Sequence, residues 1–395
     1  MSSPPPPGPL VRLSGITLSR LPSPAATPET LSPLVHAILR EALPFLYSAT
    51  SKSGSGAPDS RRWRHKGDRR SPDSAAKVEA WERVVVTTTT TTPEGGSRAG
   101  RSRETWALRR SVHEDRAEPG TASWAEFERC FRDEHAEAEE AFTPNAVAAH
   151  EALVWEGCAG VPPAREEGEG EGRAWGRFRL KVQEMRHKIG APLRDRTFPV
   201  LQLTAAVVEG GGGAAPEFVV VSIPVPDFGE SESSRLASEK GAQVASYVSV
   251  ERIRKLESGK IEWLMATASD AGGVLPQFVQ NMAMPGIVWK DVPLFLGWIA
   301  KERQKRDIAR DGVAGRGQRE RDVAVPASTA AQDTPLVATG PDATTAHEVS
   351  IGDAASTETK RETEVSTGPE VTNLPGLSQA DTTTEGPRPG VTTNV

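Results

Sequence analysis

The chain has 395 residues and a formal net charge of -6, with an isoelectric point near 5.8. This balance argues against a nucleic-acid-binding protein, which usually carries a basic domain or stripe. Two cysteines, Cys130 and Cys158, and the lack of an Asn-x-Ser/Thr glycosylation site argue against a disulfide-rich secreted protein. The sequence contains neither a run of about 18 apolar residues nor a signal-peptide pattern. We therefore expect a soluble cytoplasmic protein; residues 1–28, which have two arginines and no acidic residue, leave a mitochondrial location as the alternative.

Pro, Gly, Ser and Thr are unevenly distributed along the chain, which predicts one folded domain with flexible additions. The predicted parts are a Pro-rich N-terminal segment (1–29), a domain (30–308) with low-complexity insertions at about 50–103 and 163–173, and a tail (309–395). The tail contains almost no large apolar residues, so it cannot bury enough surface to offset its chain entropy. We expect the insertions and the tail to be disordered.

The first predicted helix covers residues 32–43, where Ser32 suits the N-cap, apolar residues recur at helical spacing, and Pro44 ends the pattern. Between 48 and 103 only residues 80–86 have the pattern of a strand. The basic run RRWRHKGDRR at 61–70 suits phosphate or an anionic membrane, but its surroundings favour a solvated loop.

A strand is predicted at 106–113, and the turn after it leads into a well-marked helix start. Ser123 and Glu126 form a capping box, in which each side chain satisfies a backbone donor of the other residue. Phe127 and Phe131 belong to an apolar stripe, and acidic residues cover the opposite face through Glu140. Pro144 closes this element.

Further strands are predicted from alternating or continuous apolar residues, and they make up an antiparallel sheet of five or more strands. Their ranges are 149–155, 177–184, 199–208, 217–226, 244–254 and 261–267. The last two are joined by ESGK, whose Ser-Gly pair suits a tight hairpin.

The terminal helix is predicted in two pieces, 274–284 and a second piece that Asp291 caps, with Pro285 and Gly286 between them. In the second piece one face consists of Val292, Phe295, Leu296 and Ile299, and Leu294 and Trp298 make the helix apolar nearly all round. We therefore expect this piece to be deeply buried until Lys301.

Taken together, these segments resemble a fungal START-like family of unknown function within the START/Bet v 1-like helix-grip superfamily. The resemblance rests on WALRRSVHE with GTASWAEFERCF, on AFTPNAV, and on the stretch from Tyr247 to Ile299, and it spans roughly residues 30–305. It implies an α+β helix-grip fold, in which a curved antiparallel sheet wraps around a long C-terminal helix. It supplies no catalytic residues to carry over.

The resemblance also implies a tunnel of the kind that START relatives use for lipids. Large apolar side chains on sheet and helix support a cavity independently, since Met side chains adapt to varied ligands. The candidate cavity residues are Trp263, Met265, Phe278, Met282, Phe295, Trp298 and Arg252. For any single one of the apolar candidates, filling the core is the preferred interpretation.

Few residues offer catalytic or metal chemistry. His135 and Glu139 have the one-turn spacing of a metal-ligand pair, but further ligands are missing, so a pair on the helix surface is favoured. Cys130 is expected to be inert. Glu251 and Arg252 place charges in a predicted strand; an inward position would suit a ligand head group, but an outward lattice on the solvated face is preferred.

The leading hypothesis is a non-enzymatic, monomeric protein that binds or transfers a lipid or other hydrophobic small molecule. It has no cofactor, no metal and no nucleic-acid partner, and it contacts a membrane surface transiently. One alternative is an interaction module with a closed core and a recruiting tail. A less favoured alternative is a cyclase-like enzyme in the same cavity, which requires an inward-facing acid-base pair such as one that includes His113 or Glu251.

Overall fold

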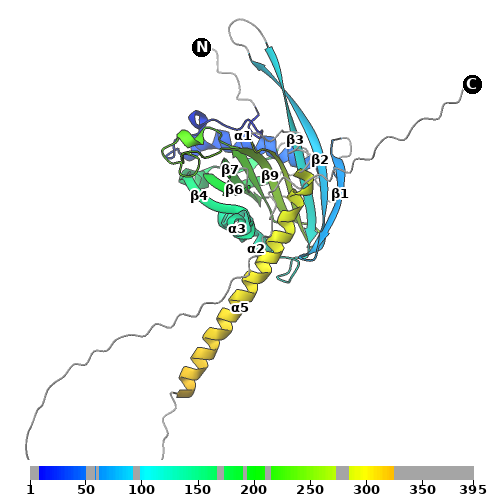
Figure 1. The fold of residues 1–395 in the computed structure, drawn as a ribbon, viewed down its shortest axis with the longest axis vertical. Coiled ribbons are helices and arrows are strands. Elements are labelled where there is room, and N and C mark those ends of the chain that lie inside the picture. The colour runs from blue at the N-terminus through cyan, green and yellow to red at the C-terminus, as the bar shows by residue number, and fades with distance from the viewer. Residues whose placement is uncertain are drawn as a thin grey trace, which may run out of the picture. The chain divides into compact units, whose positions relative to one another are not determined.

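The computed structural model describes residues 9–49, 58, 62–91, 98–166, 173–189, 194–209, 215–272 and 284–323. The strands among these residues form one ten-stranded sheet (Figure 1). In chain order they are β1 (Arg64–Ser71), β2 (Ser74–Thr91), β3 (Arg98–His113), β4 (Ala146–Val154), β5 (Ala164–Arg165), β6 (Ala174–His187), β7 (Arg196–Glu209), β8 (Glu217–Pro224), β9 (Ser246–Lys255) and β10 (Ile261–Asp270).

The order across the sheet is β1-β2-β3-β10-β9-β8-β7-β6-β4, and β5 pairs with β6. Every pairing is antiparallel. The central pairing of β3 with β10 joins residues about 150 positions apart, and places Arg109 opposite Met265. The predicted antiparallel sheet in an α+β fold is confirmed.

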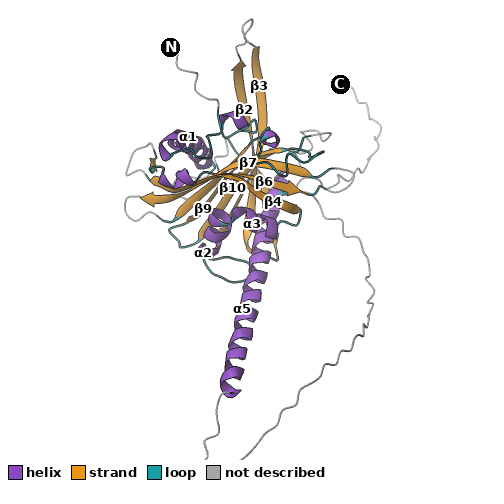
Figure 2. Ribbon diagram, turned by 90° about the vertical axis from the view of Figure 1, so that its left-hand side faces the viewer, coloured by secondary structure: helices purple, strands orange, loops and turns teal. Residues whose placement is uncertain are grey.

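Helices cover both faces of the sheet (Figures 1 and 2). Helix α1 (Pro28–Tyr47) lies on one face, which we call the outer face. The other, inner face carries α2 (Trp124–Phe127), a π-helical turn (Glu128–Asp133), α3 (His135–Phe142) and the first turns of α5 (Asp291–Val323). Because successive side chains of a strand point to opposite faces, each strand contributes to two separate layers.

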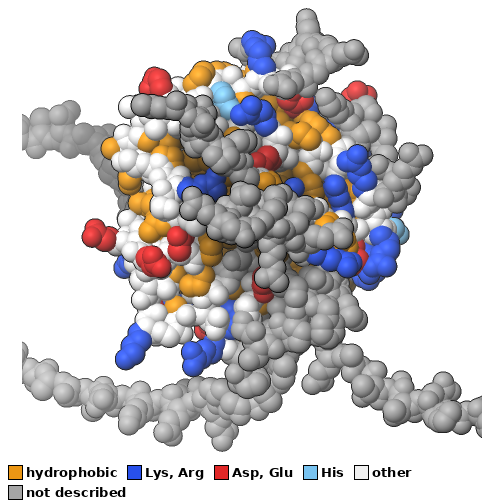
Figure 3. Space-filling view, turned by 90° about the horizontal axis from the view of Figure 1, so that it is seen from above, with side chains coloured by type: hydrophobic (Ala, Val, Ile, Leu, Met, Phe, Trp, Pro, Cys, Tyr) orange, Lys and Arg blue, Asp and Glu red, His pale blue; other side chains and the backbone are white. Residues whose placement is uncertain are grey.

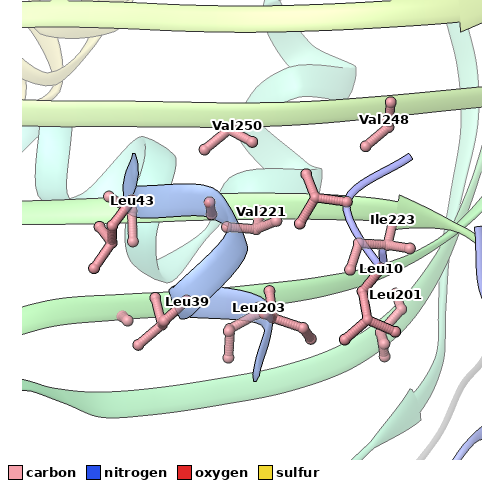
Figure 4. Close-up of a cluster of buried hydrophobic side chains, with 14 of the residues drawn as sticks. Leu10, Leu39, Leu43, Leu201, Leu203, Val221, Ile223, Val248 and Val250 are labelled. Atoms are coloured by element: carbon pink, nitrogen blue, oxygen red, sulfur yellow. The ribbon is translucent and has the colours of Figure 1, made fainter. Parts of the chain in front are cut away.

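Most of the outer layer is an apolar core, and the part beneath α1 is aliphatic (Figure 4). Leu39 and Leu43 of α1 and Leu10 of the N-terminal segment face branched aliphatic side chains of β7, β8 and β9. These strand residues are Leu201, Leu203, Val221, Ile223, Val248 and Val250. Burial of this kind contributes about 25 cal/mol per Å² of apolar surface, so this layer is a principal source of stability.

Helix α1 is longer than predicted at both ends. It begins after Thr27, with Pro28 in its first turn, and runs through Pro33 and Pro44 to Tyr47. Both internal prolines are exposed, so the carbonyl groups that lose a helical partner face solvent. The apolar stripe continues to Leu46, which is fully buried, and this packing outweighs the cost of Pro44.

The prediction that residues 48–103 are mostly unstructured is wrong for the part that the structure describes. The basic run is strand β1, and β2 begins at Ser74, so the expected strand at 80–86 is only the middle of a longer one. Alternation in β1 is hidden because it is an edge strand, with polar residues on both faces, and because its pairing with β2 contains two irregularities. Residues 92–97, within the Thr- and Gly-rich part, lie outside the described residues.

The capping box at Ser123 and Glu126 is confirmed. The helix that follows is not continuous to Glu140, as predicted; a π-helical turn (Glu128–Asp133) and a break at Glu134 separate α2 from α3. This change of register turns the second segment, so that residues expected on a solvated acidic face point towards the sheet. Ala136 and Ala138 of α3 are buried.

The terminal helix is partly as predicted. Val292, Phe295, Leu296 and Ile299 are fully buried, whereas Leu294 and Trp298 are only half-buried, so the helix is not buried all round. Arg303 anchors it by donating to both carboxylate oxygens of Glu126, each at 2.7 Å. Lys305 begins a second unit, for which the structure describes helix as far as Val323, beyond the predicted end near 308. Residues 274–283 of the first predicted piece (274–284) and residues 324–395 lie outside the described residues.

Part of the predicted N-terminal segment belongs to the fold. Leu10, Val11 and Ile16 are buried in the outer core. The carboxylate of Glu41 in α1 accepts hydrogen bonds from the backbone N–H groups of Leu10 and Val11, at 2.6 and 2.8 Å. The segment therefore closes one end of the outer layer.

Candidate functional site

The inner layer contains a cavity between the sheet, α3 and the segment 284–291 that leads into α5. About 210 Å³ is open to the centres of water-sized molecules. One buried water needs only roughly 15 Å³ on that measure, so the space suits an organic molecule rather than a few waters. Its lining residues are Arg109, Phe131, His135, Glu139, Phe142, Thr143, His187, Ile189, Phe198, Ser222, Tyr247, Ser249, Glu251, Met265, Thr267, Ser269, Ala271, Met284, Ile287, Val288 and Asp291.

Strand register brings the inward residues of β9 and β10 side by side. Glu251 lies opposite Met265, Ser249 opposite Thr267, and Tyr247 opposite Ser269. Ser222 of β8 is the next neighbour of Ser249. Small hydroxyl side chains at the centre of the inner face leave the space that larger residues would fill. The cavity thus follows from which residue types occupy the inward positions.

One end of the cavity is charged. Arg109 of β3 lies with its Nη2 3.3 Å from Oε1 of Glu251 and its Nε 3.5 Å from Oδ2 of Asp291, the first residue of α5. Arg109 is 1% exposed, and its Nη1 has no hydrogen-bond partner among the described residues. A buried donor without a partner is costly, so this atom marks a place where a ligand oxygen would be stabilised.

Trp263 holds this charged end in place from the core side. Its indole N–H donates to Oε1 of Glu251 at 2.6 Å, and the Arg109 guanidinium lies over its ring, 4.0 Å from the centroid. A cation above an aromatic face is attracted by the ring quadrupole. Trp263 therefore positions both members of the Arg109–Glu251 pair.

His135 of α3 connects two carboxylates at the same end. Its Nε2 lies 3.6 Å from Oε2 of Glu251, and its Nδ1 lies 3.6 Å from Oε2 of Glu139, one helical turn away. The amide of Gln202 on β7 also lies 3.3 Å from Nδ1. The arrangement alternates acid and base: Glu139, His135, Glu251, Arg109, Asp291.

Burial shifts the proton affinities of this group. It raises the pKa of Glu139 to about 7, against the opposing charge of His135. Burial likewise raises the pKa of Asp291 to about 6, against the charge of Arg109. For Glu251, burial raises the pKa, but His135 and Arg109 outweigh it and the net shift is downward. For His135, burial lowers the pKa, but Glu251 and Glu139 outweigh it and the net shift is upward. At neutral pH the site therefore contains ionised and proton-exchanging groups together.

The remaining walls are mostly apolar, apart from the hydroxyl side chains of the central strands. Phe131 and Phe142 come from the helical side, and Phe198 and Met265 from the sheet. The segment 284–291 closes another side, and the Ser269 hydroxyl donates to Sδ of Met284 at 3.4 Å. A charged end joined to an apolar chamber matches a molecule with a polar head and a hydrophobic body.

The sequence-predicted cavity residues have three different locations. Met265 lines the cavity. Trp263, Phe295 and Trp298 instead belong to the neighbouring aromatic core, where Trp263 and Phe295 are fully buried, so the alternative of core filling holds for these three. Phe278 and Met282 lie outside the described residues.

Arg252 is on the opposite face of the sheet. It is fully buried there and pairs with Glu262 at 2.9 Å. The prediction of an outward lattice on a solvated face is wrong for both charges, because α1 covers the face of Arg252 and the cavity lies on the face of Glu251. Because side chains alternate along β9, one of Glu251 and Arg252 had to point to the inner face. Neither is solvated, because helices cover both faces of the sheet.

Sequence reasoning also misplaced His135 and Glu139, which line the cavity instead of the helix surface. Arg109 was not considered at all. A usable signal existed for Arg109, since it stands between the small residues Ala107 and Ser111 at the inward positions of β3. His113 is buried beside Ser111 at 2.8 Å and does not line the cavity.

Two negative findings concern the described residues only. In this part of the chain no group of three or more His, Cys, Asp or Glu side chains is arranged to hold a metal ion. No helix in the same ranges is both long enough and apolar enough to span a membrane.

The sheet gripping a C-terminal helix, with a cavity between them, defines a START-like helix-grip protein. Residues 106–299 match the model of a family described as "Protein of unknown function (DUF3074)". The matched range is just under half of the chain, and it contains the second half of β3, α3, β9, β10 and the start of α5.

Solved structures with similar folds include three human START proteins. STARD10 is 11% identical, with a TM-score of 0.40, over 68% of this chain and 82% of that one. The StAR-related lipid transfer protein 5 is 11% identical, with a TM-score of 0.38, over 71% and 99%. The lipid transfer and protein localization domain of StarD13 (DLC2) is 12% identical, with a TM-score of 0.35, over 60% and 88%. No curated protein matches the sequence.

Proposed function

We propose that this protein binds a hydrophobic small molecule with a polar head group, a lipid in the simplest case, inside the inner cavity. The observation that carries the proposal is the joining of one charged end to mostly apolar walls within a single cavity. TM-scores of 0.35 to 0.40 are too low to support a ligand, so the cavity itself supports the proposal.

The head group belongs at the charged end. Nη1 of Arg109 is a donor, and Oε2 of Glu139 an acceptor, that have no hydrogen-bond partner among the described residues. A head group that both accepts and donates satisfies the two atoms at once. The aromatic and methionine walls then cover the hydrophobic body, with Met265 and Met284 adapting to its shape.

Native mass spectrometry of the full chain, purified from a eukaryotic host, tests the proposal. We expect a mass increment that disappears on unfolding and a lipid or similar compound in the organic extract. The comparison is with Ser249→Leu, in which a larger side chain enters the cavity from the centre of the sheet. A folded wild type without a bound compound, and without uptake of a sterol, a fatty acid or a phospholipid from vesicles, would contradict the proposal.

A second candidate is an acid-base enzyme acting on a molecule held in the same cavity. The observation in its favour is the inward-facing group of Glu139, with a pKa of about 7, and His135 beside Arg109. A carboxyl group with a pKa near the ambient pH is suited to take a proton from a substrate carbon. A guanidinium group is suited to stabilise the oxyanion that forms.

Solvent deuterium distinguishes binding from this chemistry. The ligand recovered from the protein would be incubated with it in D₂O and examined by mass spectrometry. Proton abstraction predicts deuterium at a carbon position with wild type, and little with Glu139→Gln. A ligand that remains bound but never exchanges carbon-bound hydrogen rules out the enzymatic candidate and leaves the binding proposal in place.

A further inference from the structure

Strand β1 forms a basic edge of the sheet, although the chain as a whole is acidic. Residues 62–70 contain five Lys or Arg and one Asp, whereas the formal net charge of the chain is -6. We define the basic edge as Arg64, Lys66, Arg69 and Arg70. Figure 3 shows Lys and Arg side chains gathered on the right-hand side, where β1 lies in Figure 1.

Only one end of the basic edge is neutralised by neighbours. Arg64 and Lys66 both pair with Glu82 of β2, at 2.5 and 3.5 Å. Among the described residues no carboxylate pairs with the side chain of Arg69 or Arg70. An edge with unneutralised cations attracts anions locally even when the net charge of the protein is negative.

Exposed apolar residues continue this surface on the neighbouring strand. Val84 and Val86 of β2 are 38% and 50% exposed. They continue the every-second-residue series of Val78, Ala80 and Glu82. They therefore lie on the inner face, which carries the cavity. Because the two valines are two residues apart on one face of β2, they form a small continuous apolar surface.

The surface also adjoins the cavity wall. Residues Met284–Gly286 and Val288–Lys290 pack against β2 and β3, and Ile287, Val288 and Asp291 of this segment line the cavity. Trp289 is half-buried here, and its indole N–H donates to the carbonyl of Gly286 at 3.0 Å. A Trp ring with one polar edge is the side chain best suited to a membrane-water interface.

We propose that the basic edge, with Val84, Val86 and Trp289, binds the surface of an anionic lipid bilayer. This inference rests on the proposed function, because a hydrophobic ligand has to pass between a bilayer and the cavity wall at 284–291. The cations follow the edge of the sheet from Arg64, two β2 positions from Val84, to Arg69 opposite Val78. A row of cations that continues into exposed valines and a Trp matches a bilayer, which presents phosphate groups above hydrocarbon. A nucleic acid would satisfy the cations and leave the apolar residues in water.

Vesicle co-sedimentation of the full chain tests this surface. Vesicles of phosphatidylcholine containing phosphatidylserine are compared with vesicles of phosphatidylcholine alone, at low and at high salt. The variant is Arg64→Gln/Arg69→Gln/Arg70→Gln, which leaves Lys66 to pair with Glu82. Each basic residue near an anionic surface strengthens binding about fivefold, so partitioning should fall on the order of 100-fold. The control is Arg20→Gln/Arg40→Gln/Arg235→Gln, with the same change of charge on exposed residues elsewhere.

A second variant, Val84→Ser/Val86→Ser, tests the apolar part and should weaken binding even at high salt, where the charge contribution is screened. Vesicle binding by wild type that requires phosphatidylserine and is lost only in the β1 and β2 variants would support the proposal. Equal losses in the control variant, binding to an anionic polymer but not to vesicles, or no binding by wild type would overturn it.

Ligand content separates this inference from the proposed function. Native mass spectrometry should find the same bound compound in the β1 variant as in wild type, because the substituted residues do not line the cavity. Loss of vesicle binding with full ligand content supports the docking surface. If the wild type binds vesicles as expected but never contains a ligand, the proposed function is contradicted and the docking surface is not.

Discussion

The two faces of the sheet are built from the same strands, but one is closely packed and the other contains a cavity. On β9, Val248 and Val250 point to the outer face and pack against α1 in a continuous aliphatic core. Tyr247, Ser249 and Glu251 alternate with them and line the inner cavity. The outer face supplies close packing, and the inner face trades part of that packing for a chamber with a charged end. Substitutions at neighbouring positions of one strand should therefore affect either stability or ligand binding.

The largest expected effect comes from breaking the charged end of the inner face. Arg109→Met would leave the buried Glu251 with His135 as its remaining cationic neighbour and would remove the cation beside the half-buried Asp291. Removing one partner of a buried ion pair typically costs about 3–5 kcal/mol of unfolding free energy. Urea unfolding should show this loss, and any protein that still folds should have lost its ligand. A variant as stable as wild type would contradict the assigned role of Arg109.

A cavity made in the outer face should affect stability alone. Leu203→Ala removes a fully buried side chain that faces α1, which should cost about 3 kcal/mol. Ligand content per folded molecule, measured by native mass spectrometry below the unfolding transition, should stay unchanged. Loss of ligand in proportion to the loss of stability would show that the two faces are not independent.

The reverse change on the inner face should affect binding alone. Ser249→Leu fills cavity space, so we expect at least a tenfold loss of ligand affinity and a change in unfolding free energy below about 1.5 kcal/mol. Val250→Phe, one residue further along β9, is the matched comparison. It should destabilise the packed outer layer by about 1–3 kcal/mol and leave the cavity unchanged.

The smallest effect concerns the pH dependence of the inner face. Burial raises the folded-state pKa of Glu139 to about 7, from an ordinary value of 4.5. Its contribution to stability is thus fully present below pH 4.5 and is lost as the pH rises through 7. The Glu139→Gln variant keeps a neutral side chain at every pH. Between pH 4.5 and pH 7 its unfolding free energy should therefore fall by about 2 kcal/mol less than that of wild type.

The groups facing Glu139 in this titration are His135, Glu251, Asp291 and Arg109. His135 acts in the same direction, because its raised pKa also favours the folded state at low pH. Parallel pH profiles for wild type and Glu139→Gln would contradict the raised pKa of Glu139.

Local patterns predicted much of the fold. The hairpin of β9 and β10, the capping box at Ser123 and the buried face of α5 each depend on neighbouring residues, and each is confirmed. Gly259 has a positive φ of 79° in the hairpin turn, the conformation that glycine adopts without strain. Strand β1 was missed because an edge strand has no apolar alternation to reveal it.

The site was less predictable, because its residues come together only through long-range pairing. Arg109 meets Glu251 through the register of β3 with β10 and of β10 with β9. His135 reaches them because the π-helical turn rotates α3 towards the sheet. No local sequence pattern predicts this strand register or the π-helical turn. The i, i+4 spacing of His135 and Glu139 could be read from the sequence, but the residues around them could not.

The central claim is that the inner face alone holds the ligand, and photo-crosslinking tests it most directly. The full chain would be irradiated with diazirine-bearing fatty acid, sterol and phospholipid probes, and the labelled residues mapped by peptide mass spectrometry. The account predicts labels on the inward residues of β9 and β10 and on 284–291, with loss of these labels in Ser249→Leu. Labels confined to α1 and the outer face, or labels that Ser249→Leu does not change, would contradict it.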